Sequence, residues 1–336
     1  MPERSPDIVI VSVTSTTGWG NAVRRLAASF TAAGARVGIA ETGPVTEVRT
    51  FMATDFVQAL AARRTAAAAL AVHRPRALVY CSITAALLWP APGAIWLDAI
   101  AAENRPGRHG AWQRRVELRR IAAAPLVMTM ATDSLAPIPP RDRPPTVVVP
   151  VAIDRSGAVE TESARDIDVL AYTGDPVKRR LEFILASWRS ARRDGERMVV
   201  TGIDRDAAGV DPEDGVRFVG RLAPSEFRAL LRRARVFVTA PRREDFGITA
   251  LEALADGAML VTTPAPGPYP ALALARALDP RLVSDDIASA LRHALDDPLR
   301  NYAERADELV RQFGIARVSA TLRDRVLPRL LPGWEA

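Results

Sequence analysis

The sequence predicts an α/β protein built from two domains with parallel sheets. Its 336 residues are enough for two domains of about 150 residues each. Short apolar runs that read as buried strands alternate with helical segments, and this alternation favours parallel βαβ units. A proline-rich stretch at residues 136–145 interrupts the alternation and cannot form regular structure. We therefore expect domains at residues 1–145 and 146–315, followed by a C-terminal helix at 316–336.

The composition narrows the class of protein. Hydrophobic residues make up 48% of the chain, but no apolar run reaches the roughly 18 residues that a membrane-spanning helix needs. A single cysteine, Cys81, excludes an intramolecular disulfide and a cysteine-rich metal site. The charged first residues lead directly into a strand-like run, so we expect no signal peptide and a cytoplasmic protein.

The chain is basic, with a formal net charge of +6, and arginine supplies nearly all of the positive charge. Part of this charge reflects the overall composition of the chain, which is rich in arginine as well as in alanine and proline. Its functional explanations are attraction to phosphorylated substrates or peripheral contact with an anionic membrane surface. No basic stretch is interleaved with aromatic residues, and this argues against nucleic acid as a partner.

The first half opens as a βαβ pattern. Apolar runs predict the strands, and alanine-rich or basic amphipathic segments predict the helices. The loop at residues 14–21 contains Gly18, Trp19 and Gly20, but these glycines do not form a complete dinucleotide fingerprint, so NAD has little support as a cofactor. The predicted strands are 7–13, 36–40, 77–81, 94–97 and 126–130, and the predicted helices are 22–33, 54–72 and 111–123.

The second half is organised around residues 236–263. A strand at 236–239, a polar loop, a helix at 247–255 and a strand at 258–262 form the crossover unit of a parallel sheet. A ligand would lie beyond the carboxyl end of the first strand and at the N-terminus of the helix, where free N–H groups attract phosphate. The other predicted strands are 168–173, 198–203 and 216–220, and the other predicted helices are 181–193, 225–233, 285–295, 299–313 and 318–331.

Two acids frame the start of this helix, Glu244 in the loop and Glu252 inside the helix. Glu252 shares a helix face with Thr249, one turn earlier. A phosphate on the N–H groups of residues 247–249 would therefore leave Glu252 near an attached ribose, while Glu244 could reach hydroxyl groups beyond the phosphate. The alternative for each acid is a solvated carboxylate, which near a helix N-terminus also favours the helix dipole.

Residues 244–257, EDFGITALEALADG, carry a Glu-x7-Glu spacing around Asp-Phe-Gly-Ile. This segment resembles the donor-site motif of the family 4 retaining glycosyltransferases. The resemblance covers residues 147–303 well and the first half in architecture only. It implies the GT-B fold, in which two Rossmann-like domains have parallel sheets facing an interdomain cleft, and it implies a nucleotide-sugar donor. It also implies that Glu244 contacts the transferred sugar, that Glu252 binds the ribose, and that the residues between them bind the donor: Phe246, Gly247, Ile248 and Thr249.

The loop GDPVKRR, which follows the first predicted strand of the second half, is the candidate diphosphate site. Family members have Gly-Arg after this strand and a lysine a few residues later, and both cations bind the donor diphosphate. Gly174 matches this pattern, whereas Asp175 occupies the place of the arginine. Lys178 is the only lysine in the chain, and its compact ammonium suits a diphosphate oxygen. Arg179 or Arg180 would supply the second cation, and a solvated basic helix start is the alternative.

The first half supplies candidates through the same resemblance. The first loop faces the cleft in GT-B enzymes, which makes Gly18 a candidate donor contact and Trp19 a candidate stacking surface for the acceptor, with packing at the loop base as the alternative. Asp98 stands where many family members carry a histidine. His109 could hydrogen-bond the donor sugar or the acceptor, and an exposed loop histidine is the alternative. For Arg105 two interpretations are equally supported: a contact for an acceptor phosphate, or a surface charge without a role in binding.

These observations predict a retaining glycosyltransferase that uses a UDP- or GDP-sugar and an acceptor that is a small molecule, a glycan or lipid-linked. Arg221 follows a strand that resembles the nucleobase-binding edge of the family. We expect no metal cofactor. The chain has two Asp-x-Asp pairs of the kind that could hold a diphosphate through a metal, but the pair at 166–168 lies at the entrance of a strand and the pair at 204–206 reads as a solvated turn. The resemblance also implies that residues 316–336 cross back to the first domain. The alternatives are a sugar-nucleotide epimerase of the same fold and a non-catalytic nucleotide-sugar-binding protein.

Overall fold

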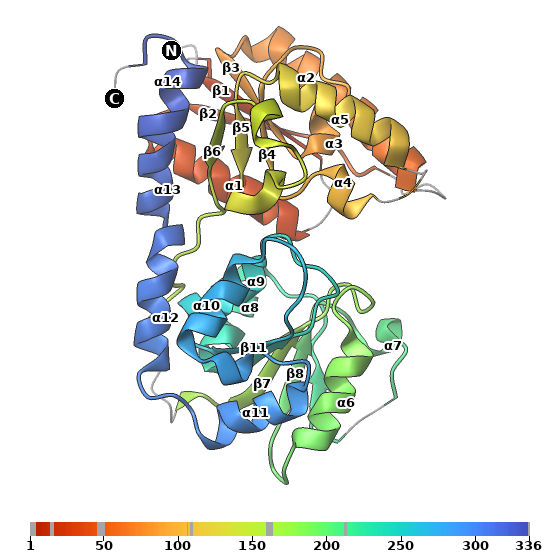
Figure 1. Ribbon diagram of the computed structural model, residues 1–336, viewed down its shortest axis with the longest axis vertical. Coiled ribbons are helices and arrows are strands. Elements are labelled where there is room, and N and C mark those ends of the chain that lie inside the picture. The colour runs from red at the N-terminus through yellow and green to blue at the C-terminus, as the bar shows by residue number, and fades with distance from the viewer. Residues whose placement is uncertain are drawn as a thin grey trace. The chain divides into compact units, whose positions relative to one another are not determined.

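The chain forms two compact units, each with its own parallel sheet and covering helices (Figure 1). The computed structural model describes residues 5–13, 17–45, 51–105, 107, 110–158, 164–211 and 214–334. Unit 1 combines Met1–Ala152 with Phe313–Ala336, and unit 2 is Ile153–Gln312. The predicted fold class, α/β with two Rossmann-like parallel sheets, is confirmed.

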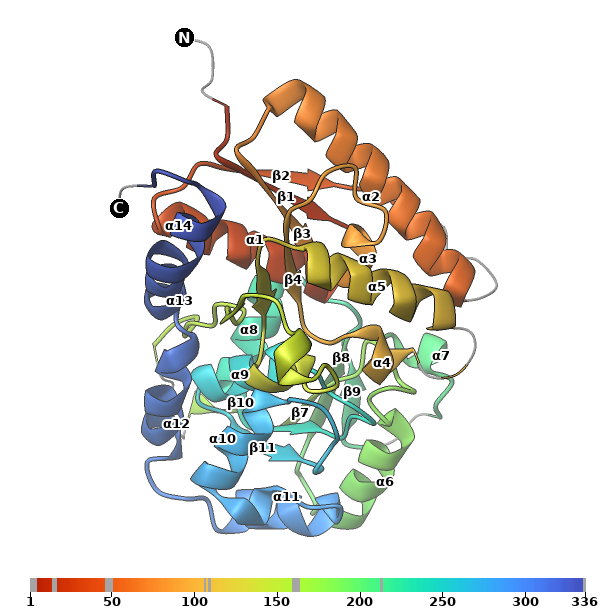
Figure 2. The same cartoon turned by 45° about the horizontal axis from the view of Figure 1, so that its top comes forward.

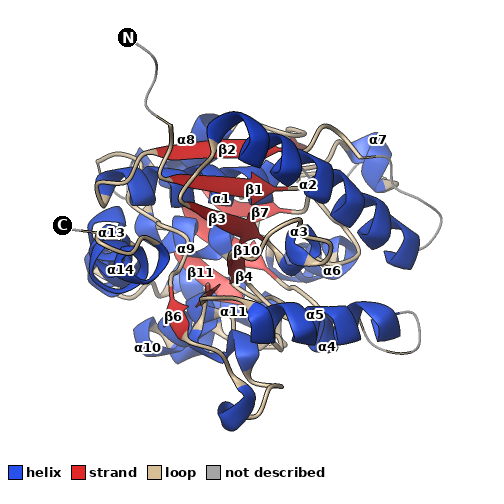
Figure 3. Cartoon of the chain, turned by 90° about the horizontal axis from the view of Figure 1, so that it is seen from above, coloured by secondary structure: helices blue, strands red, loops and turns tan. Residues whose placement is uncertain are grey.

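Unit 1 contains a six-stranded parallel sheet in the order β2-β1-β3-β4-β5-β6. Its inner strands include the continuous apolar runs IVIVS and AIWL, which are buried along their whole length. Such strands are typical of parallel sheets with helices on both faces, and Figure 3 shows strands enclosed by helices. The strands are β1 (Ile8–Ser12), β2 (Val37–Glu41), β3 (Ala77–Cys81), β4 (Ala94–Leu97), β5 (Val127–Thr129) and β6 (Thr146–Val148).

The helices of unit 1 bury small residues against this sheet. On α2 (Phe51–His73), Ala62 and Ala66 lie in the core and permit a close approach to the strands. α2 also contacts α5 (Ala111–Ala123) through Phe56 and Trp112, whose ring centroids are 6.2 Å apart (Figure 2). The remaining helices of the first 152 residues are α1 (Thr17–Ala32), α3 (Ile83–Ala86) and α4 (Ala101–Asn104), with 3-10 turns at Thr132–Leu135 and Pro140–Asp142.

The first helix begins earlier than predicted. α1 starts at Thr17, so Gly18, Trp19 and Gly20 belong to its first turn and do not form a loop. Glycine costs a helix only about 1 kcal/mol relative to alanine. The apolar face of α1 packs in the core, with Leu26 and Phe30 fully buried, and this packing offsets the cost of the two glycines.

The C-terminal segment belongs to unit 1. It contains α13 (Ile315–Thr321), a π-helical stretch at Leu322–Val326 and α14 (Leu327–Leu330). α13 packs against α1 (Figure 1). The guanidinium of Arg76 donates a hydrogen bond of 2.8 Å to the carbonyl oxygen of Pro332. These contacts attach the end of the chain to the sheet of its first half.

Unit 2 contains a five-stranded parallel sheet in the order β11-β10-β7-β8-β9. The strands are β7 (Ile167–Tyr172), β8 (Met198–Thr201), β9 (Val216–Phe218), β10 (Ala234–Thr239) and β11 (Met259–Thr262). The helices are α6 (Leu181–Ala191), α7 (Arg205–Ala208), α8 (Pro224–Arg233), α9 (Ile248–Ala255), α10 (Pro270–Leu278), α11 (Ile287–Asp296) and α12 (Tyr302–Val310), with 3-10 turns at Pro280–Leu282 and Arg311–Phe313.

The strand order of unit 2 creates a topological switch point between β7 and β10. From β7 the chain builds the sheet to one side through β8 and β9, and then returns to add β10 and β11 on the other side. The loops that leave β7 and β10 therefore diverge at the carboxyl edge of the sheet. Open α/β sheets bind their ligands in the crevice at this position.

Two details of the predicted organisation are corrected. Residues 146–148 pair with β5 as strand β6, so the first sheet extends past the proline-rich stretch and the division falls after Ala152 instead of after residue 145. Residues 270–278, which carried no predicted element, form α10. Pro270 is the first residue of α10, where the missing N–H of proline leaves no intrahelical hydrogen bond unmade.

Candidate functional site

The two loops at the switch point of unit 2 are bonded to each other. The backbone N–H of Arg242, in the loop after β10, donates to the carbonyl oxygen of Lys178 at 2.9 Å. The Nε of Arg242 donates to the carbonyl oxygen of Val177 at 3.2 Å. Residues 174–180, after β7, and residues 240–247, after β10, are therefore in direct contact, and the predicted donor residues of the two loops lie close together.

An ion pair crosses this site between Arg179 and Glu244. Both side chains are largely buried, with 14% and 8% of their surfaces exposed. The backbone N–H of Glu244 also donates to the carbonyl oxygen of Pro266 at 3.0 Å, which fixes the loop. The solvated-carboxylate alternative for Glu244 is therefore wrong. A buried carboxylate held by a guanidinium is a fixed hydrogen-bond acceptor at the mouth of the switch point.

The N-terminus of α9 faces the same site with a glycine as its N-cap. Gly247 has a φ of 80°, and the N–H of Leu251 donates to its carbonyl oxygen at 3.0 Å. A Cβ at this position would lie 2.6 Å from Cε2 of Tyr269, so both backbone conformation and space require glycine. Because glycine has no side chain that could cap the helix, the N–H groups of the first turn are available to an anion.

The ring of Tyr269 packs closely against Gly247. Its side chain is fully buried, and its hydroxyl lies 3.1 Å from Oγ1 of Thr262. Burial raises the pKa of Tyr269 above its usual range, so the phenol stays neutral. This role was not predicted, because Tyr269 lies in the Pro/Gly-rich stretch 265–270, which reads as a loop.

Glu252 lies in the second turn of α9 and is only 6% exposed. Its Oε1 is 3.5 Å from Nη1 of Arg228, a buried residue of α8. The solvated-carboxylate alternative for Glu252 is therefore wrong as well. A buried carboxylate next to a fixed cation stays oriented, and such a group suits the two hydroxyls of a ribose.

Arg228 is held in turn by Asp256, the C-cap residue of α9. The Nε of Arg228 donates to Oδ2 at 2.5 Å and its Nη2 donates to Oδ1 at 2.9 Å. Oδ1 of Asp256 also accepts hydrogen bonds from the backbone N–H and the hydroxyl of Ser156 at 2.8 and 3.0 Å. From the sequence, Asp256 was predicted only to mark the end of the helix, and Arg228 was not predicted to have a role. A contact between residues this far apart in the chain leaves no periodic signal.

The remaining predicted cations of the donor site differ in their surroundings. Lys178 is exposed, and no hydrogen bond or ion pair of its ammonium is found among the residues that the structure describes. Asp175, in the place of the family arginine, accepts a hydrogen bond of 2.8 Å from the backbone N–H of Lys178 and shapes the turn. Arg180 stacks on the ring of Phe183, with Cζ 4.0 Å from the ring centroid. Arg221 is exposed.

The backbone of the two loops is constrained at other predicted positions. At Gly174 a Cβ would lie 2.6 Å from the hydroxyl oxygen of Tyr172, so a larger residue would force a rearrangement. Phe246 is 3% exposed, and its ring is buried in the core. Ile248 and Thr249 are partly exposed in the first turn of α9, where their N–H groups lie beside Gly247.

The predicted residues of the first half lie in unit 1. Gly18 is exposed in the first turn of α1. Trp19 packs on the buried ring of Trp96, with centroids 5.8 Å apart, as the packing alternative for this residue expects. Asp98 is half-buried, and its Oδ1 accepts a hydrogen bond of 2.8 Å from the N–H of Ala99.

Two further candidates of unit 1 have different outcomes. Arg105 forms an ion pair with the buried Asp55, with Nε 3.0 Å from Oδ2, so its charge is committed within unit 1. His109 lies outside the described residues. Within the described ranges no cluster of three or more His, Cys, Asp or Glu side chains is placed to hold a metal ion. In the same part of the chain, no helix has the length and apolar character needed to cross a bilayer.

Comparison with known proteins places this geometry in context. Residues 190–313 match the model of the family described as glycosyl transferases group 1, a segment that includes Glu244 and Glu252. No curated protein sequence matches the chain. Among solved structures, sucrose-phosphate synthase from Thermosynechococcus elongatus is 17% identical with a TM-score of 0.73, and the match covers 94% of this chain and 96% of the other.

Two more solved structures are similar over nearly the whole chain. WaaG, a glycosyltransferase involved in lipopolysaccharide biosynthesis, is 16% identical with a TM-score of 0.66, covering 95% of this chain and 99% of the other. The α,α-trehalose 6-phosphate synthase from Burkholderia multivorans is 11% identical with a TM-score of 0.65, covering 97% and 98%. At these identities the likeness concerns the fold, which is GT-B.

Proposed function

We propose that this chain, a glycosyltransferase with the GT-B fold, moves a sugar from a UDP- or GDP-sugar to an acceptor with retention of the anomeric configuration. The observation that carries the proposal is the arrangement of three residues around the start of α9. Glu244 lies in the loop before the helix, Gly247 caps it, and Glu252 follows in its second turn. A donor diphosphate at the helix N-terminus therefore has one carboxylate on each side.

The diphosphate would be bound by backbone dipoles and by cations from the facing loop. The N–H groups of the first turn of α9 and the helix dipole favour an anion. Lys178 is exposed on the loop after β7, which is hydrogen-bonded to the loop after β10. Its neighbour Arg179 forms the ion pair with Glu244. Positive charge placed in advance near the leaving diphosphate lowers the barrier without reorganisation during the reaction.

The two carboxylates would position the donor on either side of its phosphates. Glu252 accepts hydrogen bonds from the ribose hydroxyls, and Glu244 accepts hydrogen bonds from hydroxyls of the transferred sugar. Positioning of this kind converts the transfer into an effectively intramolecular step. In unit 1, Gly18, Trp19, Asp98, Arg105 and His109 stay predicted substrate contacts.

The proposed chemistry uses no protein nucleophile. The bond between the anomeric carbon and the diphosphate oxygen breaks, and the acceptor oxygen forms its bond on the same face of the sugar. The acceptor proton passes to the departing phosphate oxygen. We propose that no divalent metal is needed, because Lys178, Arg179 and the helix N-terminus can supply the positive charge that the leaving group requires.

A turnover assay over a panel of UDP- and GDP-sugars tests the proposal. We expect release of the nucleoside diphosphate when a suitable acceptor is present, the same rate in EDTA, and an unchanged anomeric configuration in the NMR spectrum of the product. Isomerised nucleotide sugar without release of diphosphate would indicate an epimerase. Donor binding without any turnover would indicate a non-catalytic binding protein.

A further inference from the structure

A pocket of about 380 Å³ opens in unit 1, and none of the residues assigned to the donor is among those that line it. It lies past the carboxyl ends of β4 and β5, because Ile100 and Ala102 follow β4 and Pro137 and Ile138 follow β5. This is the edge where open α/β sheets bind ligands, and the volume lies in the range of small-molecule sites. The third wall comes from α5, which contributes Ala111, Arg114, Arg115, Glu117 and Leu118.

The walls of this pocket are mostly apolar, and one of them faces water. Leu118 is 49% exposed, and the exposed arginines Arg115 and Arg119 lie on the same helix. Ile138 and Ile100 are buried behind it, at 4% and 1% exposed. Covering an exposed leucine and filling an apolar pocket is favourable in proportion to the area removed from water. The pocket therefore favours a ligand with an apolar group.

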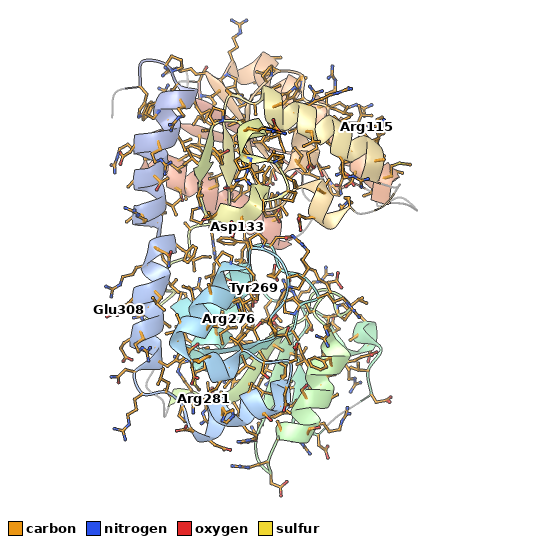
Figure 4. All side chains as sticks on the ribbon, viewed as in Figure 1. Arg115, Asp133, Tyr269, Arg276, Arg281 and Glu308 are labelled. Atoms are coloured by element: carbon orange, nitrogen blue, oxygen red, sulfur yellow. The ribbon has the colours of Figure 1, made fainter. Side chains whose placement is uncertain are left out.

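The rim of the pocket is positively charged. Arg115 is exposed and projects from α5 (Figure 4). Arg114 is oriented by its own hydrogen bond of 2.5 Å to the carbonyl oxygen of Arg105. Two guanidinium groups beside one pocket favour a phosphate or carboxylate on the ligand.

The acid of the pocket, Glu117, does not cancel this charge. It is only 1% exposed, and its two carboxylate oxygens both lie 2.9 Å from the N–H of Ala101, from which they accept. Burial raises the pKa of Glu117 to about 7, against the lowering effect of that hydrogen bond and of the nearby Arg105 and Arg114. Near neutral pH the carboxyl is therefore often protonated, and the rim keeps its positive charge.

We propose that this pocket binds a small amphiphilic anion, in which an apolar group is joined to a phosphate or a carboxylate. The apolar group lies against Leu118 and Ile138, and the anionic group lies at Arg115 and Arg114. If the proposed function holds, on which this last step rests, such an anion is the chemical class of the acceptor. The pocket would then select acceptors by an apolar part as well as by charge.

Calorimetric titration of the full chain with monomeric octyl phosphate tests the binding. We expect one equivalent to bind, and inorganic phosphate or octanol alone to bind at least tenfold more weakly. Leu118→Gln should weaken octyl phosphate binding at least tenfold, and Arg115→Gln should do the same. Arg119→Gln is the matched control, because Arg119 is an exposed arginine of the same helix that does not line the pocket.

Other outcomes overturn the proposal in recognisable ways. Equal affinity of octyl phosphate for the wild-type protein, Leu118→Gln and Arg115→Gln would place its binding elsewhere. Binding of octanol as tightly as octyl phosphate would remove the role of the rim. Binding to anionic phospholipid vesicles without binding of monomeric octyl phosphate would make α5 a membrane-contacting surface and not a ligand site.

The acceptor assignment is tested separately, in a turnover assay with a panel of hydroxyl compounds that carry an apolar group, an anionic group, both or neither. We expect the fastest release of nucleoside diphosphate with members that carry both. Turnover with members that lack the apolar group, at the same rate, would overturn the assignment. Octyl phosphate binding without turnover of any nucleotide sugar would sustain the pocket and contradict the proposed function instead.

Discussion

Arg228 and Asp256 form a doubly hydrogen-bonded ion pair in unit 2, with donor–acceptor distances of 2.5 and 2.9 Å, directly beside Glu252. The pair joins α8 to the C-terminal end of α9, and Asp256 also accepts hydrogen bonds from Ser156. Both charged side chains are almost completely buried. The helix that carries the proposed ribose-binding carboxylate is therefore fixed at the end opposite to the phosphate site.

Arg228→Met should destabilise the protein by about 3–5 kcal/mol, because it leaves the carboxylate of Asp256 buried without its cation. Urea unfolding monitored by circular dichroism measures this free energy. Arg233→Met is the matched control on the same helix, since Arg233 pairs with Asp166 at an exposed site and its loss should cost at most about 1 kcal/mol. An equal loss of unfolding free energy in the two variants would show that the buried pair stabilises the protein no more than the exposed pair does.

Gly247→Ala should destabilise the protein more than the same change at another glycine with positive φ. The new Cβ would lie 2.6 Å from the ring of Tyr269, and the backbone has a φ of 80°. We expect a loss of about 2–4 kcal/mol, since strain of the left-handed region and overpacking add together. Gly195→Ala is the control, with a φ of 85° and no atom within 4 Å of the new Cβ, and should cost only about 1–2 kcal/mol. A Gly247→Ala protein as stable as Gly195→Ala would contradict the close packing of Tyr269 beneath α9.

Lys178→Ala should lower turnover of the nucleotide sugar at least about tenfold, because one lost phosphate contact corresponds to about 1.4 kcal/mol of barrier. The steady-state rate at saturating donor is the measurement. Arg180→Ala is the comparison, since the guanidinium of Arg180 stacks on the ring of Phe183. If Arg180→Ala is the damaging change and Lys178→Ala is harmless, the diphosphate contact was assigned to the wrong residue.

Glu117 should make the stability depend on pH near neutrality. Its folded-state pKa is raised from 4.5 to about 7 by burial, so the folded protein binds more protons than the unfolded chain between these values. Stability should therefore fall as pH rises through this window, by up to roughly 3 kcal/mol, and then level off. Glu117→Gln removes the titrating group, and unfolding curves at several pH values should show a smaller slope. The same slope in both proteins would assign the pH dependence to other groups.

Much of the fold followed from local pattern. β3, β4 and α5 have the bounds that their apolar runs and helical segment predicted, because buried parallel strands and long helices leave a strong signal in the sequence. β6 and α10 were missed because each lies next to prolines, which were read as the end of regular structure. Proline at the first residue of a helix is compatible with the helix, and the sequence pattern did not distinguish this case.

The candidate site followed from the sequence only as far as local spacing reaches. The spacing of Glu244 and Glu252 placed both acids beside the start of α9, and the loop signal placed Lys178 opposite. The partners of these residues, Arg228 above all, come from distant parts of the chain, and only the folded structure brings them together. For the same reason the sequence left both acids open as solvated groups, whereas packing buries them.

Titration of the protein with UDP and GDP, comparing wild type with Glu252→Gln, tests the central claim most directly. Glu252 is assigned to the ribose, and a charged hydrogen bond contributes about 1.5–3 kcal/mol, so we expect affinity for the preferred nucleotide to fall at least about tenfold. Glu308→Gln, an exposed glutamate of α12 (Figure 4), should bind as the wild type does. An unchanged affinity in Glu252→Gln, with the wild type binding one of the two nucleotides, would contradict a donor site at the N-terminus of α9.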